Sequence, residues 1–153
     1  MKVVLNKCYG GFVPSHEAVI RYAERKGIKV FPYIFTRVEY GYEFRRSKGL
    51  DDIREYDKFH QTWGWGNVLF LTKDRGPRFD DVTDAIRKDI MNVSDDELRF
   101  DPDFIATVEE MGHDASTYTS ELRVIEFEPP EGFVPKVIDN DGMELLVDGR
   151  WCW

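Results

Sequence analysis

The sequence predicts one α/β or α+β domain over residues 1–153, with a mixed β-sheet, helices packed on that sheet and a C-terminal β-hairpin. Three observations lead to this prediction. Short apolar runs end at glycine or proline, stretches with apolar residues at helical spacing begin at capping residues, and an Asp-Gly turn separates the last two apolar runs. A chain of 153 residues with 42% hydrophobic side chains is long enough to bury a core of its own.

The beginning of the chain predicts a strand, a glycine loop, a helix and a second strand. Ser15 is a good N-cap for the helix, and Gly27 ends it as a C-cap does. If the two strands are parallel neighbours, their crossover is right-handed and the loop lies at the carboxyl end of the first strand, where open α/β sheets commonly bind ligands. The two expected strands are residues 2–9 and 28–36.

The remaining elements follow from the same signals, apart from one stretch that is hard to assign. Residues 37–66 mix charged and aromatic side chains, and we expect a loop-rich excursion there with a short helix near residues 50–56. Asp101 and Pro102 mark the clearest helix start, with Asp as N-cap and Pro in the first turn. The other expected elements are strands at 67–72 and 122–127, helices at 79–90 and 102–111, and a hairpin of strands 134–138 and 143–147 with a four-residue connection.

The charge balance limits the classes of partner. With 21 Lys and Arg against 29 Asp and Glu, the net charge is −8, which argues against bulk nucleic acid and anionic membranes as partners. One local basic pocket for a phosphate stays compatible with this charge. No apolar stretch approaches the length of a membrane span, and Cys8 and Cys152 are expected to be reduced thiols of a cytoplasmic protein. The 14% aromatic content is compatible with a homo-oligomer.

The loop after the first strand is the strongest candidate for a ligand site. Glycines let a ligand approach the backbone, free N–H groups at a helix start attract anions, and a lysine adds positive charge. The alternative is a tight strand-to-helix turn with Tyr9 and Phe12 in the core, since neither the P-loop nor the dinucleotide-binding pattern is present. The candidate ligand-binding residues of this loop are Asn6, Lys7, Cys8, Tyr9, Gly10, Gly11, Phe12 and Ser15.

Four residues outside the loop are further candidates for the same ligand. Arg45 and Arg46 can bind a phosphate, because guanidinium groups match phosphate oxygens, or they can be solvated loop charges. Trp65 can stack on a ligand or cover the core beneath a long loop. Arg99 shortly precedes the helix start at Asp101 and can close over a bound ligand.

Catalytic and metal-binding sets are not recognisable in the sequence. Cys8 is a nucleophile only if a base such as His16 activates it, and a buried structural cysteine is the simpler interpretation. The three histidines are scattered, and the acidic stretches lack the spacing of a calcium loop. We therefore expect no metal and no cofactor, and favour a binding protein over an enzyme.

Two segments of the chain resemble a family of small uncharacterised proteins of bacteriophages and prophages. The first is Asn-Lys-Cys-Tyr-Gly-Gly-Phe from Asn6, with Ser15 opening the helix. The second is Arg-Phe-Asp-Pro-Asp from Arg99, and residues 122–126 and 141–144 are similar to the family's last strands. The resemblance implies a phage setting and no established activity.

Three functions from different classes fit these observations. The first is a binding protein for a small phosphorylated, nucleotide-type ligand, which in a phage setting can sequester an immune signalling nucleotide of the host. The second is an acidic interaction protein that inhibits a host factor and uses tryptophans as anchors. The third is a nucleotide hydrolase or transferase. The expected location is the cytoplasm of the host cell.

Overall fold

The chain is an α+β protein in a computed structural model that describes residues 1–60 and 68–151. The expected class and the C-terminal hairpin are confirmed. The strands are β1 (Lys2–Asn6), β2 (Phe31–Val38), β3 (Gly41–Arg46), β4 (Val68–Leu71), β5 (Arg78–Phe79), β6 (Leu122–Glu126), β7 (Pro135–Asn140) and β8 (Met143–Asp148). The helices are α1 (His16–Arg25), α2 (Leu50–His60), α3 (Asp84–Asp89), α4 (Asp95–Phe100) and α5 (Pro102–Met111), with 3-10 turns η2 (Gly112–Ala115) and η3 (Gly149–Trp151).

The strand pairings of the described residues are all antiparallel. One sheet has the order β4-β2-β3-β5, while β1 pairs with β6 and β7 pairs with β8. The condition for a right-handed crossover is therefore not met, because β1 and β2 belong to different sheets and are not parallel neighbours. A strand-helix-strand pattern does not distinguish a return to the same sheet from passage to another one, since the helix buries an apolar face in both cases.

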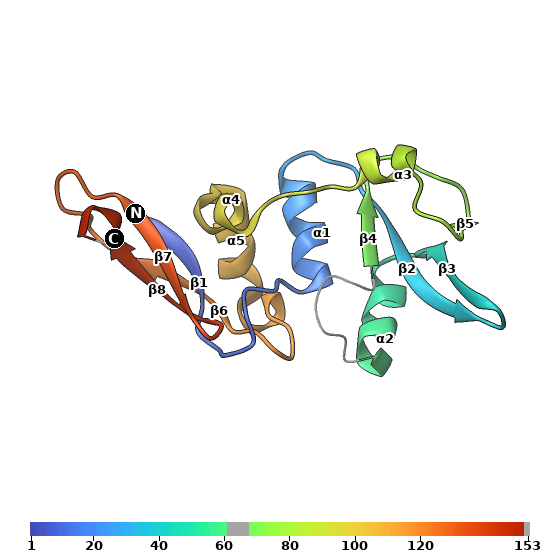
Figure 1. The fold of residues 1–153 in the computed structure, drawn as a ribbon, viewed down its shortest axis with the longest axis horizontal. Helices are drawn as coiled ribbons and strands as arrows, with labels where there is room; N and C mark the ends of the chain where they lie inside the picture. Colours follow the sequence, from blue (N-terminus) through green and yellow to red (C-terminus); the bar gives the residue numbers. More distant parts are fainter. Residues whose placement is uncertain (61–67, 152–153) are drawn as a thin grey trace.

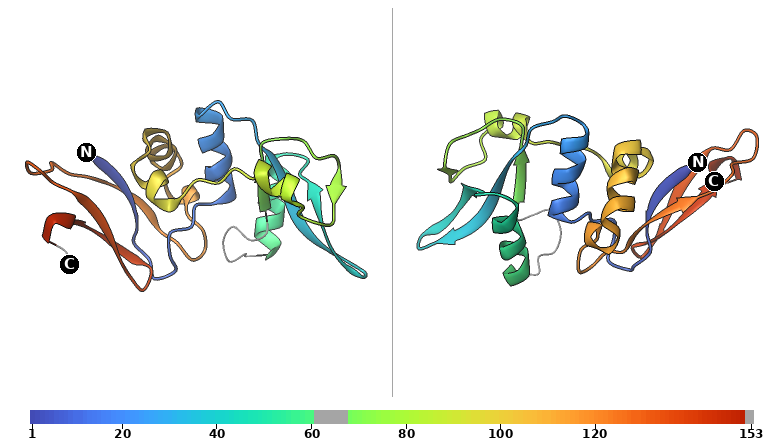
Figure 2. Two further views of the ribbon diagram at one scale, coloured as in Figure 1. Left: turned by 45° about the horizontal axis from the view of Figure 1, so that its top comes forward. Right: turned by 180° about the vertical axis from the view of Figure 1, so that it is seen from behind.

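The helices α1, α4 and α5 lie between two groups of strands, as Figure 1 shows and the two views of Figure 2 confirm. Helix α1 contributes to both hydrophobic clusters beside it. Ala18 and Tyr22 pack with Phe104 of α5, whereas Val19 packs with Ile34 of β2 and Ile53 of α2. Because its two faces are both occupied, α1 holds the two ends of the molecule together.

The stretch expected to be a loop-rich excursion is mostly regular as far as residue 60. It contains the end of β2, all of β3 and helix α2, so the expected helix near residues 50–56 is confirmed and the loop-rich character of 37–60 is wrong. Aromatic residues alternate along the two strands, and Phe35 lies opposite Phe44 on one face of the hairpin. This alternation with period 2 is the strand signal that the intervening charges obscured.

The middle of the chain departs from the expected helix at 79–90. Residue Phe79 belongs to β5, and α3 begins only after the N-cap Thr83, whose side chain accepts a hydrogen bond from the Ile86 N–H. The acidic stretch at 95–97 opens α4, which was not expected, behind the N-cap Ser94. The helix with Asp101 as N-cap is confirmed as α5.

The turn of the C-terminal hairpin has two residues instead of the expected four. Asn140 pairs directly with Met143, so Asp141 and Gly142 alone connect the strands. Their φ angles are 54° and 93°. Positive φ at both positions is the requirement of the type I′ turn, whose twist matches that of the flanking strands.

The two ends of the molecule differ in charge. Residues 31–90, which form the four-stranded sheet and helices α2 and α3, carry 11 Lys and Arg and 11 Asp and Glu. The net charge of −8 is therefore carried by the rest of the chain, which includes β1, β6 and the C-terminal hairpin. Among the described residues, no helix is both long enough and apolar enough to cross a membrane.

Candidate functional site

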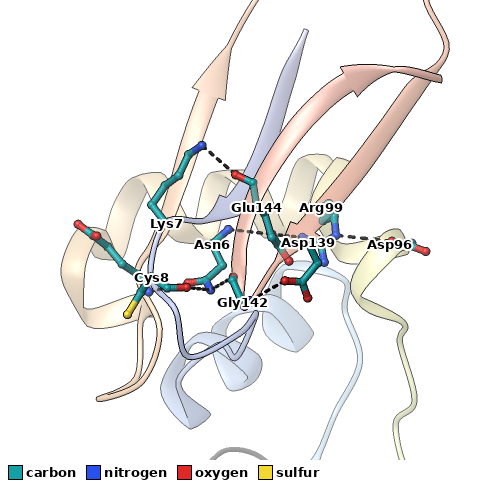
Figure 3. A network of polar contacts seen from close by, with 9 residues as sticks. Asn6, Lys7, Cys8, Asp96, Arg99, Asp139, Gly142 and Glu144 are labelled. Atoms are coloured by element: carbon teal, nitrogen blue, oxygen red, sulfur yellow. Dashed lines mark hydrogen bonds and ion pairs between the residues drawn. The ribbon is translucent and has the colours of Figure 1, made fainter. Parts of the chain in front are cut away.

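The main buried polar arrangement links β1, α4 and β8 (Figure 3). The Glu144 carboxylate accepts hydrogen bonds from the Asn6 backbone N–H at 2.8 Å and from Arg99 Nη1. Glu144 is 2% exposed and Arg99 6% exposed, so both charges are removed from water. We call Asn6, Lys7, Arg99 and Glu144 the Glu144 network.

Asn6 joins four segments of the chain through this network. Its Nδ2 donates to the carbonyls of Cys8 at 2.7 Å and Gly142 at 2.5 Å, and its Oδ1 accepts from the Glu121 N–H at 2.9 Å. The side chain therefore ties β1 to its own loop, to the residue before β6 and to the hairpin turn. A buried amide whose donors and acceptor are all satisfied favours one arrangement of these segments.

Arg99 is held by three different contacts. Besides Glu144, its Nε lies 3.5 Å from Asp96 Oδ1, and its guanidinium carbon lies 4.3 Å from the centre of the Phe12 ring. The Nε has no hydrogen-bond partner within the described part of the chain. The guanidinium is therefore neutralised and stacked inside the protein, and its Nη1 is committed to Glu144.

Lys7 also points inward to β8. Its Nζ donates to the Glu144 backbone carbonyl at 3.0 Å, and its backbone N–H donates to the Glu121 carbonyl at 2.7 Å. Cys8, the next residue, is a half-buried free thiol, and Tyr9 is 66% exposed. The loop thus turns from buried contacts to solvent within three residues.

The glycines of the loop and of the hairpin turn allow close approach of protein backbone. A Cβ on Gly10 would lie 1.6 Å from the Thr119 carbonyl oxygen, and a Cβ on Gly142 would lie 2.5 Å from the Tyr9 carbonyl oxygen. No side chain fits at these distances without movement of the backbone. At these two positions the missing side chain is explained by packing within the chain.

The end of the loop leads directly into α1. Phe12 is 8% exposed, and its ring centroid lies 6.1 Å from that of Phe104. The alternative interpretation, which placed Phe12 and Tyr9 in the core, is therefore confirmed for Phe12 and wrong for Tyr9, which is exposed. The Ser15 hydroxyl accepts from the Ala18 N–H and donates to the Asp114 carbonyl at 2.7 Å. Ser15 is therefore the N-cap, as predicted.

The other arginine candidates lie on β3, at the opposite end of the molecule from the Glu144 network (Figure 1). Arg45 pairs with both carboxylate oxygens of Asp52, at 2.7 and 3.0 Å, and Arg46 donates to Asp74. The Arg45 hydrogen bonds hold the pKa of Asp52 below its ordinary value of 3.8. The structure therefore separates these arginines from the glycine loop, and Trp65 lies outside the described residues.

Asp101 connects the start of α5 to α1. Its carboxylate accepts from the Asp103 N–H, from the Tyr22 hydroxyl at 2.9 Å and from Lys26 Nζ at 2.8 Å. Burial and the hydrogen bond to Asp101 raise the pKa of Tyr22 to about 12. The Asp that the sequence identifies as a cap thus also fixes the packing of two helices.

His16 contacts a carboxylate and not Cys8. Its Nδ1 lies 2.8 Å from Asp57 Oδ1, and the histidine is 6% exposed. The pair joins the first turn of α1 to α2. The contact of His16 with Asp57 therefore gives no support to a role of His16 as a base for Cys8. Among the described residues, no group of three or more His, Cys, Asp or Glu side chains is placed to hold a metal ion.

The geometry of the Glu144 network serves to fasten the C-terminal hairpin to the body of the protein. Its cations already have protein partners, so a phosphate would compete with existing bonds. The prediction of a phosphorylated ligand stays a prediction. Sequence reasoning brought Asn6, Lys7 and Arg99 forward but missed Glu144 as their common partner. A charged residue two positions after an Asp-Gly turn, in an otherwise apolar strand, was a visible signal.

No family model, curated protein or solved structure matches the chain.

Proposed function

We propose that this protein is a binding module that presents the outward face of its β7–β8 hairpin to a partner protein. Directly opposite residues of an antiparallel pair share a face, so Ile138 lies beside Leu145, with Val147 and Met143 on the same side. Ile138 is 38% exposed and Leu145 is 51% exposed. This exposed apolar pair on a projecting hairpin is the observation that carries the proposal.

The other face of the hairpin supports this function. It carries Glu144, which is buried against Asn6 and Arg99, and Gly142, which packs against the loop after β1. A two-stranded hairpin is only marginally stable by itself. Fastened through its inner face, the hairpin is held in one orientation before a partner arrives, which lowers the entropic cost of binding.

The charges around the hairpin indicate which kind of partner surface it would fit. The net negative charge is carried outside residues 31–90, and Glu131 before the hairpin and Asp141 in its turn contribute to it, while Asp139 lies opposite Glu144 on the inner face. Pro135 and Lys136 stand on β7, and both residue types protect strand edges from pairing with another chain. These features favour docking of the hairpin face into an apolar groove rimmed by Lys and Arg.

This function corresponds to the acidic interaction protein among the three expected functions. In the phage setting implied by the family resemblance, the partner would be a host protein and the location the host cytoplasm. The small phosphorylated ligand has less support, because Lys7, Arg45, Arg46 and Arg99 each have a protein partner.

Site-specific photo-crosslinking tests the proposal. A benzophenone amino acid replaces Leu145 in one variant and the exposed Lys88 on α3 in a control, and each is irradiated in lysate of the natural host cells. We expect one defined crosslinked protein at position 145 that is absent at position 88 and lost when Ile138→Asp is added. No adduct at position 145, or the same adducts at both positions, would contradict the proposal.

A further inference from the structure

Strand β6 has one edge that no other strand of the described residues covers. Met1 and Phe127 exchange backbone hydrogen bonds in both directions at 2.9 Å, and the Lys7 N–H donates to Glu121. In an antiparallel ladder, hydrogen-bonded and non-hydrogen-bonded pairs alternate. The backbone N–H and C=O groups of residues 123 and 125 therefore also point towards β1. The N–H and C=O groups of residues 122, 124 and 126 therefore point away from β1.

These outward groups lie along a groove. The Leu122 N–H is satisfied by Ser116 Oγ at 2.9 Å, but within the described residues no hydrogen bond is recorded for the Val124 N–H or C=O on this side. The groove measures about 450 Å³ and runs between β6 on one side and the end of α5 with η2 on the other. Val108, Leu122 and Val124 form its apolar floor.

The charged side chains of the rim are two carboxylates and one guanidinium. Glu109 and Glu121 line it, with side chains 45% and 41% exposed. Lys2 donates to both carboxylate oxygens of Glu109, and Arg123, which also lines the groove, pairs with Glu121. The C-terminal end of α5 adds the negative end of its dipole.

We propose that this groove binds an extended peptide segment of a partner, which adds as a third strand to β6. The free backbone groups of residue 124 select an extended chain, because a helix or a small rigid ligand cannot continue a ladder. The floor accepts a β-branched apolar side chain, and the two rim carboxylates favour neighbouring Lys residues over acidic ones. This site is independent of the β7–β8 face, since none of its lining residues belongs to the hairpin.

Fluorescence anisotropy with a labelled peptide of alternating valine and lysine provides the test. Val124→Pro removes the outward N–H without touching the ladder to β1, whereas Val124→Ala keeps that N–H and is the matched control. We expect the proline variant to bind at least about tenfold more weakly and the alanine variant to bind within about threefold of the original chain. Glu109→Gln together with Glu121→Gln is expected to weaken binding by a similar factor.

Amide hydrogen exchange keeps the proposal testable even if the proline variant does not fold. In the unsubstituted chain, the Val124 N–H should exchange rapidly when free and at least about tenfold more slowly with saturating peptide, while the Ile125 N–H stays protected in both states. Binding that is equal in the proline and alanine variants, or a Val124 N–H that the peptide does not protect, would overturn the proposal. The proposal would also be overturned if the Val124 N–H were protected without peptide and the protein sedimented as a dimer. In that case a second copy of the chain would occupy the edge of β6.

Discussion

Arg99 and Glu144 form a buried ion pair across 45 residues of sequence, between α4 and the beginning of strand β8. Their side chains are 8% and 2% exposed. Removing two charges from water is costly, and the pair is tolerated because Asn6, Asp96 and Phe12 surround it with further contacts. The pair therefore sets the position of the hairpin more than it adds stability.

Breaking this pair from one side should destabilise the protein strongly. Glu144→Gln leaves the buried Arg99 guanidinium with only the exposed Asp96 carboxylate as a counter-charge, and we expect a loss of about 3–5 kcal/mol in the free energy of unfolding. The double variant Arg99→Met with Glu144→Leu should lose less than the sum of its single variants. Urea unfolding followed by circular dichroism measures these differences.

An exposed ion pair provides the control for that measurement. Arg123 and Glu121 are 62% and 41% exposed, so Arg123→Ala should cost at most about 1 kcal/mol. If Glu144→Gln proved equally mild, the pair would not be the fastening that we describe.

The glycine at position 10 should be intolerant of any side chain. Gly10→Ala places a Cβ on the Thr119 carbonyl, and we expect a cost of about 3 kcal/mol or more, because the obstacle is backbone. Gly11→Asn is the comparison, since Gly11 has a φ of 97° but open space around it, and its cost should stay near about 1–2 kcal/mol. If the free energy of unfolding of Gly10→Ala were close to that of the original chain, packing within the chain would not explain this glycine. The interpretation of the loop as a ligand site would then be favoured.

Asp52 should contribute stability that depends on pH. Hydrogen bonds from Arg45 and from the Lys48 N–H lower its pKa in the folded state below 3.8. The folded state therefore binds the proton less tightly than the unfolded state, so this stabilisation is complete well above pH 4 and is lost as the pH falls through the folded pKa. Asp52→Asn should cost about 1–2 kcal/mol at pH 7, with a difference from the original chain that shrinks below pH 4.

Chemical unfolding at several pH values tests that sign. An unchanged difference between pH 7 and pH 3 would show that the Asp52 charge is not responsible. Asp51→Asn is a suitable control, because its side chain is fully exposed and lies one position earlier on the same helix.

The sequence predicted the elements whose signals are local. Asp101 and Pro102 define the start of α5 within one turn, and the Asp-Gly pair defines the last hairpin, because caps and turns depend on neighbouring residues. The partner of β1 was missed, because β6 lies at the other end of the chain and pairing over such a distance leaves no local mark.

For the candidate site too, the residues with local sequence signals were predicted, and their tertiary partner was not. The importance of Asn6, Lys7 and Arg99 was visible, but their shared partner Glu144 depends on a tertiary contact. The acidic stretch at 95–97 was recognised as lacking the spacing of a calcium loop, but the helix α4 that it opens was not expected. Short helices are stabilised by packing more than by propensity, and here Leu98 supplies that packing.

A row of aromatic rings should divide the β2–β3 hairpin into a core and a free tip. The Phe44 and Phe79 rings stack with centroids 5.4 Å apart, and Phe44 is 7% exposed, whereas Tyr42 is 54% exposed on the same face. Phe44→Ala should cost about 3–5 kcal/mol, because it opens a cavity among Tyr33, Phe35 and Phe79. Tyr42→Ser should cost less than about 1 kcal/mol, since most of its ring already contacts water. Thermal and urea unfolding of the two variants would place the boundary of the core between them, and a large loss for Tyr42→Ser would move that boundary to the tip of the hairpin.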